Sequence, residues 1–495
     1  MALPSTVKFN DKVKCLVVNC KLLAQDQTEK KNRMNHYKHL IIGTGQALGV
    51  LLGKLIPTNE SIGVVEAAKV GGSCVNYGCT PTKTLVASAK AFHQAQRGKF
   101  YGFEIGDVKL NYERVRERMN AIRNGGSNGL TEWMNGTSNV KLLRGTARFL
   151  DDKKVEVNGE IYTADHIYIN VGTRPSAPPI PGLSEVDWLD SAGLLDLEKI
   201  PEHLIIIGGG YIGVEFAQVF RRFGAKVSII QRSGQLMPRE DADVAEAIQE
   251  FLEEEGIDVY CNSNTTRVTQ ESGMKKVEIE HDGKKLTLIG DQLLIAAGRL
   301  PNSDTLQLEN TSIQVNKRGF IEVDSHCMTA VDEIYAVGDV NGKGAFTHTS
   351  VNDAEIVLDK LFGGDRTLET RNIVYGLFTD PPLGRVGMTE EQALAAGKKV
   401  LVAKRPMDRI SRAKEMGETK GFAKLLVDAE TDLILGASIL GVGGDEIINM
   451  FATIMHSNIP CKNYRKVVLV HPTVSELMPW ILDGIQEAKQ NQNDE

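Results

Sequence analysis

The sequence predicts an α/β protein with two Rossmann-like nucleotide-binding units and a C-terminal α+β domain. Two observations carry this prediction: a glycine-rich turn follows an apolar strand at residues 39–45, and a second such turn follows the strand at 204–213. After about residue 370, strands and helices alternate without a nucleotide signature. A chain of 495 residues is long enough for roughly three or four domains.

The first turn, residues 43–45, is predicted to join the strand at 39–42 to a helix. The next strand, 62–65, ends on Glu66, 23 residues after the first glycine of the turn, where an acidic side chain suits a ribose hydroxyl. The third glycine position of the motif is Leu48. A glycine there normally permits close packing of helix on strand, so the local geometry is in question.

The second turn, residues 208–213, has the same layout. Its second strand, 226–230, ends on Gln231, again 23 residues after the first glycine. One such turn alone is not specific, whereas two with matching strands and spacing indicate nucleotide binding. Similar turns at 172–175 and 298–302 are the expected crossings into and out of an inserted domain.

Two cysteines, Cys74 and Cys79, lie in a glycine-rich turn that opens a helix. The N-terminus of a helix stabilises a thiolate, which is the reactive form of cysteine. Such a pair can cycle between disulfide and dithiol when two electrons are supplied. The chain has seven cysteines, an odd and sparse number that does not fit a secreted disulfide framework. A reducing, cytoplasmic location is therefore expected.

The composition argues against several kinds of partner. The formal net charge of -7 disfavours nucleic acid and anionic membranes. The longest uncharged apolar run, residues 40–53, is too short to span a bilayer. No metal site is predicted.

Six motifs in this order resemble those of the flavoprotein disulfide reductases, the group of glutathione reductase, dihydrolipoamide dehydrogenase and mercuric reductase. They are the first fingerprint, the cysteine turn, Gly172-Thr173, the second fingerprint, Gly338-Asp339 and His471-Pro472-Thr473-Val474-Ser475-Glu476. The resemblance covers residues 36–485 approximately. It implies FAD on the first unit and a nicotinamide nucleotide on the second. It also implies a homodimer in which the His-Pro-Thr segment enters the active site of the other subunit.

The resemblance also gives the parts of the chain their expected roles. These are an N-terminal extension at 1–35 that need not be ordered, an FAD-binding domain at 36–175 and 296–368, an NAD(P)-binding domain at 176–295 and a C-terminal dimerisation domain at 369–495.

For catalysis, the resemblance implies that electrons pass from the nicotinamide through the flavin to the cysteine pair. Cys79 would be the thiolate beside the flavin, and Cys74 would be the interchange thiol that attacks the substrate. His471 would be the acid–base group, since imidazole titrates near neutral pH. Glu476 would orient this imidazole. A plainer interpretation of 473–476 is a capping box.

The resemblance assigns further residues to the cofactors. Lys83, four residues beyond Cys79, would lie near the flavin and pair with Glu215. On the first unit and the crossing turns, the predicted contacts are Gly43, Gly45, Glu66, Gly72, Ser73, Ala147, Gly172, Thr173, Gly298, Gly338 and Asp339. On the second unit they are Gly208, Gly210, Gly213, Gln231 and Arg232. Of these, Glu66 would bind the adenosine ribose, and Asp339 would bind the ribityl chain.

The nucleotide and the acceptor are only partly specified. Gln231 is not acidic and Arg232 follows it, which favours NADPH over NADH because a basic residue accommodates a 2′-phosphate. Segments 74–83 and 380–389 look closest to the mercuric-reductase-like branch, although no cysteine follows Cys461 to form that enzyme's C-terminal pair.

The expected function is therefore an NADPH-dependent, FAD-containing reductase of a small disulfide, a metal ion or a similar small molecule. One alternative is an NAD-linked dihydrolipoamide dehydrogenase. Another, from a different class, is a flavin-based redox sensor or binding protein with little turnover.

Overall fold

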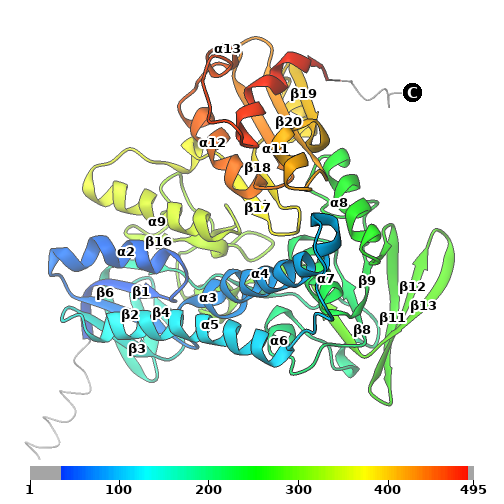
Figure 1. Cartoon of the computed structure of the whole chain (residues 1–495). Helices are drawn as coiled ribbons and strands as arrows, with labels where there is room; N and C mark the ends of the chain where they lie inside the picture. Colours follow the sequence, from blue (N-terminus) through cyan, green and yellow to red (C-terminus); the bar gives the residue numbers. More distant parts are fainter. Residues whose placement is uncertain (1–34, 489–495) are drawn as a thin grey trace, which may run out of the picture.

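The computed structural model describes residues 35–488. The expected N-terminal extension lies outside these residues, except for Asn35, which begins strand β1. Figure 1 shows the two nucleotide-binding units below and the C-terminal domain above them. The predicted fold class, two Rossmann-like units with a C-terminal α+β domain, is confirmed.

The first unit is built on a seven-stranded sheet in the order β3-β2-β1-β6-β5-β4, with β16 paired to β6. Strands β1, β2, β3, β6 and β16 run parallel, so their carboxyl ends share one edge. The strands are β1 (Asn35–Ile42), β2 (Ile62–Glu66), β3 (Val140–Arg144), β4 (Ala147–Asp151), β5 (Lys154–Val157), β6 (Glu160–Ile169) and β16 (Ile334–Ala336).

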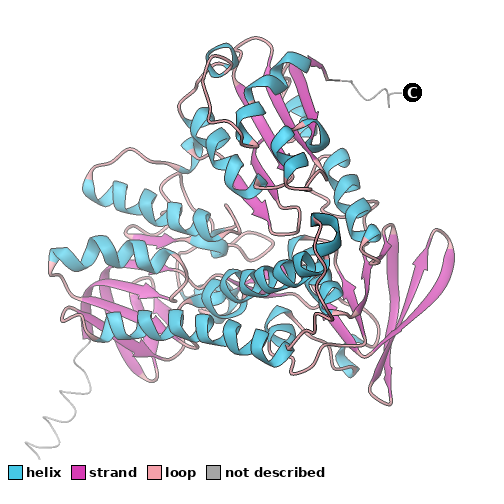
Figure 2. Ribbon diagram, in the orientation of Figure 1, coloured by secondary structure: helices cyan, strands magenta, loops and turns pink. Residues whose placement is uncertain are grey.

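The helices of the first unit, drawn beside the sheet in Figure 2, are α2 (Ala47–Leu55), α3 (Gly72–Tyr77), α4 (Cys79–Gln96), α5 (Tyr112–Asn135) and α9 (Thr347–Phe362). Helices α2, α5 and α9 pack on one face of the sheet, and the other face packs against β4, β5 and residues 306–321. Helices α2 and α9 share a core with the sheet, to which Leu48, Leu52, Tyr168 and Ile356 contribute. The central strands are buried toward their carboxyl ends, at residues 39–42 of β1, 62–65 of β2 and 167–169 of β6, as expected where parallel strands are covered on both faces.

The second unit has a parallel sheet in the order β10-β9-β8-β14 and a separate three-stranded antiparallel sheet. The parallel strands are β8 (His203–Ile207), β9 (Lys226–Ile230), β10 (Asp258–Tyr260) and β14 (Gln292–Ile295). The antiparallel strands are β11 (Ser263–Glu271), β12 (Met274–His281) and β13 (Lys284–Gly290). The helices are α6 (Ser191–Leu195), α7 (Tyr211–Phe223) and α8 (Ala242–Glu254). A two-stranded ribbon, β7 (Thr173–Pro175) with β15 (Arg299–Pro301), forms the crossing.

The C-terminal domain is a six-stranded antiparallel sheet in the order β17-β18-β21-β20-β19-β22. Its strands are β17 (Val374–Leu377), β18 (Leu383–Gly387), β19 (Val400–Pro406), β20 (Phe422–Asp428), β21 (Ile434–Leu440) and β22 (Gln486–Glu487). Its helices are α10 (Glu390–Ala395), α11 (Ser411–Glu415), α12 (Gly444–His456) and α13 (Cys461–Tyr464).

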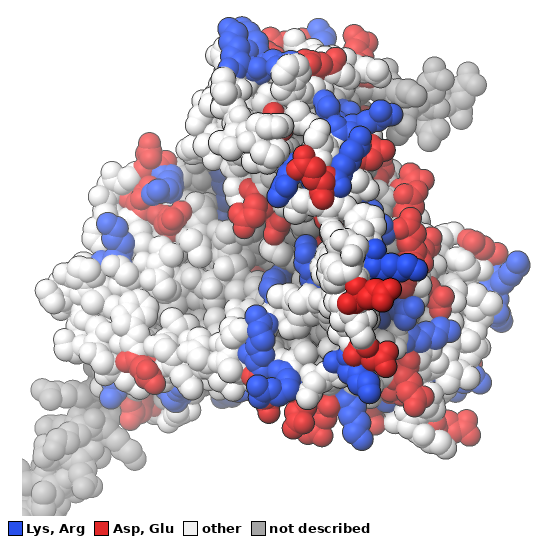
Figure 3. All heavy atoms as spheres, in the orientation of Figure 1, with Lys and Arg blue, Asp and Glu red and all other residues white. Residues whose placement is uncertain are grey.

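Acidic and basic side chains are mixed on the surface of the protein. On the face drawn in Figure 3, acidic and basic side chains alternate over the second unit and the C-terminal domain, and much of the first unit is uncharged. That face offers no continuous basic stripe of the kind that binds nucleic acid. Within residues 35–488, every helix is too short or too polar to cross a bilayer.

Candidate active site

The two cysteines lie at the junction of helices α3 and α4. The sequence predicted a glycine-rich turn for both, but Cys74 lies inside the short helix α3, and Cys79 is the first residue of α4. The two helices meet at Gly78. The Sγ atom of Cys79 is 3.4 Å from the Oγ1 atom of Thr347, at the start of α9. Both cysteines are free thiols in this structure.

The surroundings of the two thiols separate their pKa values. The hydrogen bond with Cys74 is the main cause that lowers the pKa of Cys79 to about 6. The Thr347 hydroxyl and the charge of Lys83 also lower it, against the effect of desolvation. The same hydrogen bond, together with burial, raises the pKa of Cys74. At neutral pH, Cys79 is therefore the thiolate and Cys74 the thiol.

Lys83 and Glu215 form an ion pair that joins the two units. The Nζ atom of Lys83, on α4, lies 2.6 and 2.9 Å from the carboxylate oxygens of Glu215, on α7. The Glu215 side chain is 5% exposed and also accepts a hydrogen bond from the backbone of Phe378. The Lys83 ammonium lies 4.6 Å from the centre of the Phe378 ring. Each charge thus has a partner, which a buried carboxylate requires.

The first fingerprint packs closely against Asn170 at the end of β6. A Cβ atom on Gly43, where φ is +96°, would lie 2.4 Å from the backbone oxygen of Asn170. A Cβ on Gly45 would lie 2.8 Å from the side chain of the same asparagine. The carboxylate of Glu66 accepts a hydrogen bond of 3.0 Å from the backbone of Thr44. Glycine is therefore required at both positions by the packing of the turn, and the Glu66 carboxylate is held beside that turn.

Other residues predicted to contact the first nucleotide lie near the same edge of the sheet. A Cβ atom on Gly72, where φ is +62°, would lie 2.9 Å from the Cα atom of Gly45. Ser73 is exposed in the first turn of α3, Ala147 begins β4, and Gly172 follows the end of β6 with φ at +63°. The residues present fit FAD, since the carboxyl edge of a parallel sheet is the usual place for a nucleotide.

Asp339 is joined by hydrogen bonds to the crossing ribbon of β7 and β15. Its Oδ2 atom accepts a hydrogen bond of 2.9 Å from the hydroxyl of Thr173. That hydroxyl in turn accepts a hydrogen bond of 2.7 Å from Nε of Arg299, a residue that sequence reasoning missed. Gly338, where φ is +74°, donates its backbone N–H to Asp353. The chain of hydrogen bonds fixes the Asp339 carboxylate next to the crossing ribbon.

The second fingerprint is packed tightly at its first and third glycines, whereas a Cβ atom on Gly210 would meet no atom within 4 Å. A Cβ atom on Gly208 would lie 2.4 Å from the backbone oxygen of Ala296, and a Cβ on Gly213 would lie 2.0 Å from the backbone oxygen of Gly208. The backbone N–H of Gly209 donates a hydrogen bond of 2.8 Å to Oε1 of Gln231. This bond corresponds to the one between Thr44 and Glu66 in the first unit.

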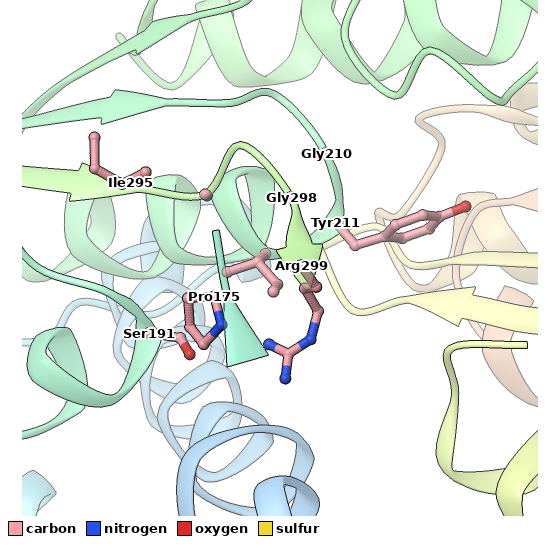
Figure 4. Close-up of a pocket in the computed structure, with 9 residues that line it drawn as sticks. Pro175, Ser191, Gly210, Tyr211, Ile295, Gly298 and Arg299 are labelled. Carbon is pink, nitrogen blue, oxygen red and sulfur yellow. The ribbon is translucent and has the colours of Figure 1, made fainter. Parts of the chain in front are cut away.

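A cavity opens between the second fingerprint and the crossing ribbon (Figure 4). It is lined by Pro175, Ser191, Gly210, Tyr211, Ile212, Ile295, Ala296, Gly298 and Arg299. Figure 4 shows Tyr211 on one side and Pro175 and Ser191 on the other. The motifs predicted Gly210 and Gly298, but not the side chains that give the cavity its chemistry.

Arg232 lies beyond this cavity, directly after Gln231. It is exposed, as is Arg239, and neither forms an ion pair within residues 35–488. Their guanidinium groups are therefore available to an anionic ligand.

His471 and Glu476 form a hydrogen-bonded pair in the C-terminal domain. The Nδ1 atom of His471 lies 2.9 Å from the Glu476 carboxylate, and the imidazole is 77% exposed. The backbone N–H of Glu476 donates to the hydroxyl of Thr473, which is half of the predicted capping box. The carboxylate itself faces the histidine. Within the described chain, His471 makes no hydrogen bond to either cysteine, and its neighbour Val470 is 77% exposed.

Comparison with known proteins gives two family matches. Residues 37–354 match the model for "Pyridine nucleotide-disulphide oxidoreductase", and residues 373–482 match the dimerisation domain of the same family. The probable pyridine nucleotide-disulfide oxidoreductase RclA of Escherichia coli is 39% identical over 90% of this chain and 98% of its own length. A mercuric reductase of Bacillus cereus is 32% identical over 91% of this chain and 73% of its own length.

A solved structure agrees with these matches. The Cu(II) complex of the HOCl-induced flavoprotein disulfide reductase RclA from Escherichia coli has a TM-score of 0.82 and 36% identity. The alignment covers 91% of this chain and 99% of that chain.

Proposed function

The chain belongs to the pyridine nucleotide-disulfide oxidoreductases, enzymes that use FAD and NAD(P)H, and from this premise we propose that it passes electrons from NADPH through Cys74 and Cys79 to a small-molecule acceptor. The observation that carries the proposal is the position of the two cysteines: Cys79 begins helix α4 with its Sγ atom 3.4 Å from the Thr347 hydroxyl, and Cys74 lies in the helix just before it. A low pKa on Cys79 keeps one sulfur as a thiolate, and a raised pKa on Cys74 keeps the other protonated until a base removes its proton.

FAD, when bound, would accept a hydride from the nicotinamide and deliver the electron pair to the Cys74–Cys79 disulfide. Gly43, Gly45 and Gly72 would admit its pyrophosphate, and Glu66 would hold the ribose. In the same way, Lys83 and Glu215 would form the charged wall between the two nucleotides, and Asp339 would bind the ribityl chain.

The reduced pair would then reduce a disulfide by two exchanges. The deprotonated Sγ of Cys74 attacks one sulfur of the acceptor, which forms a mixed disulfide and releases the first thiolate. Cys79 next attacks the Sγ of Cys74, which restores the Cys74–Cys79 disulfide and releases the second thiolate. The two released thiolates take up two protons, and the acceptor is reduced by two electrons.

A base is needed for the proton of Cys74, and the partner subunit's His471 is the group that we propose. The imidazole is exposed and hydrogen-bonded to Glu476, and the apolar residues Val468 and Val470 just before it in the chain are exposed as well. The dimerisation-domain match supports a homodimer. We therefore propose that the dimer shares its active sites, and that the protein works in the cytoplasm.

NADPH is the proposed reductant because the second unit presents an amide at Gln231 and an exposed cation at Arg232. A small disulfide or a metal ion is the proposed acceptor. The metal is included because one relative is named a mercuric reductase and another was solved as a Cu(II) complex.

The experiment is an anaerobic titration of the flavin-loaded protein with NADPH and, separately, with NADH, with the whole absorption spectrum recorded. We expect a long-wavelength band from the Cys79 thiolate beside the flavin after two electrons, with NADPH at the lower concentration. Cys79→Ser should lose this band, and Cys74→Ser should show it without added reductant. Flavin reduction without the band in the native protein would favour the sensor alternative. A screen with glutathione disulfide, lipoamide, Cu(II) and Hg(II) would then identify the acceptor.

The thiol assignment has its own test. In the reduced protein, the rate of alkylation by iodoacetamide should rise with pH, be half-maximal near the Cys79 pKa of about 6 and level off about one pH unit higher. A rate that keeps rising to pH 8 or above would show that neither thiol has a lowered pKa and would contradict the division of roles.

A further inference from the structure

A buried carboxylate, Glu240, lies between the second unit and the C-terminal domain. Its side chain is completely buried. The Oε1 atom accepts two hydrogen bonds, one of 3.0 Å from the hydroxyl of Tyr211 and one of 2.7 Å from the hydroxyl of Tyr375. One tyrosine begins α7 in the second unit, and the other is on β17 of the C-terminal domain. A single oxygen thus holds two rings from different parts of the chain.

The other side of Glu240 faces a buried arginine. The Nη1 atom of Arg385 lies 3.5 Å from Oε2 of Glu240, which has no hydrogen-bond partner among the described residues. Arg385 instead donates to Asp241 at 2.9 Å and to the hydroxyl of Ser438. The positive charge of Arg385 therefore compensates the buried Glu240 carboxylate, although the hydrogen bonds of its Nη1 atom go to Asp241 and Ser438. The two tyrosines are the hydrogen-bond donors to Glu240.

Tyr211 is the member of this cluster that reaches a ligand site. It lines the cavity beside the second fingerprint. Its ring packs edge-on against Phe346 and Tyr375, with centroid distances of 5.6 Å in both cases. Phe346 and Tyr375 are themselves stacked at 5.2 Å. Such packing restricts the tilt of the Tyr211 ring, and the hydroxyl bond to Glu240 fixes the end that points away from the turn.

We propose that Glu240 is a positioning residue that holds Tyr211 at the wall of the nucleotide cavity, and so sets the affinity for the nicotinamide end of the nucleotide. The inference rests on the proposed use of this cavity by a nicotinamide nucleotide. A buried acceptor for two hydroxyl groups is costly to remove, because each hydroxyl would then be left unpaired. The tyrosine would regain a partner only by turning, and that movement changes the cavity wall.

The test uses two ligands that share the adenine end of the nucleotide. NADP⁺ fills the whole site, whereas 2′,5′-ADP lacks the nicotinamide end that Tyr211 would contact. Dissociation constants are measured by calorimetry on the flavin-loaded protein, with Glu240→Leu, Glu240→Gln, Tyr211→Phe and the Glu240→Leu/Tyr211→Phe double variant. NAD⁺ and 5′-AMP replace this pair if the native protein prefers NADH.

We expect Glu240→Leu to weaken NADP⁺ binding about tenfold and to leave the affinity for 2′,5′-ADP within about twofold of the native value. Glu240→Gln should bind both ligands with near-native affinity, because the amide oxygen still accepts both hydroxyl groups. Tyr211→Phe should weaken NADP⁺ binding in the same direction, and the double variant should be no weaker than Glu240→Leu, since both changes break one contact. If Glu240→Leu does not fold, Tyr211→Phe and Glu240→Gln decide the matter through the same two ligands.

Equal loss of both ligands would show that Glu240 only supports the fold and would overturn the inference. Unchanged NADP⁺ binding in Glu240→Leu or Tyr211→Phe would overturn it, and so would additive effects in the double variant. Failure of the native protein to bind either full nucleotide would overturn the proposed function as well.

Discussion

The two nucleotide-binding units use the same backbone contact with different side chains. In the first, the N–H of Thr44 donates to the carboxylate of Glu66, and in the second the N–H of Gly209 donates to the amide of Gln231. Both acceptors end the second strand of their unit, so the local fold is equivalent. The units differ in charge at this position, where we propose that the ribose binds. A carboxylate binds ribose hydroxyls and repels a phosphate, whereas an amide tolerates one.

The helix that follows each turn shows a second difference. Helix α2 begins at Ala47 and α7 at Tyr211, so α2 starts one position later relative to its glycines. At the third glycine position, Gly213 has no room for a Cβ atom, while Leu48 is buried in the core shared with α9. The first unit therefore has a leucine at the third glycine position because the side chain there fills the core between α2 and α9. Helix α2 keeps one exposed face, whereas α7 is buried on nearly all sides.

The largest effect is expected from Leu48→Ala, which would empty a fully packed site in the first unit. Loss of a buried leucine costs about 2–5 kcal/mol of unfolding free energy. Urea unfolding followed by flavin fluorescence measures it, since the flavin reports on the first unit. Leu300→Ala is the matched control, because Leu300 is 44% exposed and its loss should cost less than about 0.5 kcal/mol. Higher stability in Leu48→Gly would show that the unit still prefers the glycine.

The next effect concerns the glycine that the second unit retains. Gly213→Ala places a methyl group 2.0 Å from a backbone oxygen, and overpacking of this kind costs about 1–3 kcal/mol or more. We expect the Michaelis constant for NADPH to rise at least about tenfold while the FAD content stays normal. In Gly49→Ala the new Cβ meets no atom within 4 Å, so this change should be neutral or stabilise α2. Similar behaviour of the two variants would mean that the helices are packed alike.

The strands, the turns and the order of the units could be predicted because they depend on local patterns. The expected Lys83–Glu215 and His471–Glu476 contacts are present in the structure, while the roles of these residues and the domain boundaries stay predictions. The helical setting of Cys74 was missed. It is supported by Asn76, whose side-chain amide donates to the backbone oxygens of Val70 and Gly72 and so links α3 to the turn before it.

Other contacts could not be predicted because they join distant residues without any periodic pattern. Thr347 lies 268 positions from the cysteine that it contacts. Glu240 and Arg299 likewise act on side chains from other elements, and nothing in their own neighbourhood marks them. Only the folded chain brings such groups together.

The smallest effect is expected when Glu66 and Gln231, the side chains that accept the backbone hydrogen bond in each unit, are exchanged for one another's type. These variants test whether the charge of this side chain determines which nucleotide each unit binds. Gln231→Glu should lower kcat/KM for NADPH about tenfold and raise it for NADH, because the carboxylate repels the 2′-phosphate and accepts from the ribose. Glu66→Gln should weaken FAD binding by about the same factor, measured by release of flavin on dilution. In both variants the backbone N–H keeps an acceptor, so stability should barely change. If Gln231→Glu left the preference for NADPH intact, Arg232 alone would have to provide it, and Arg232→Ala would then have to abolish it.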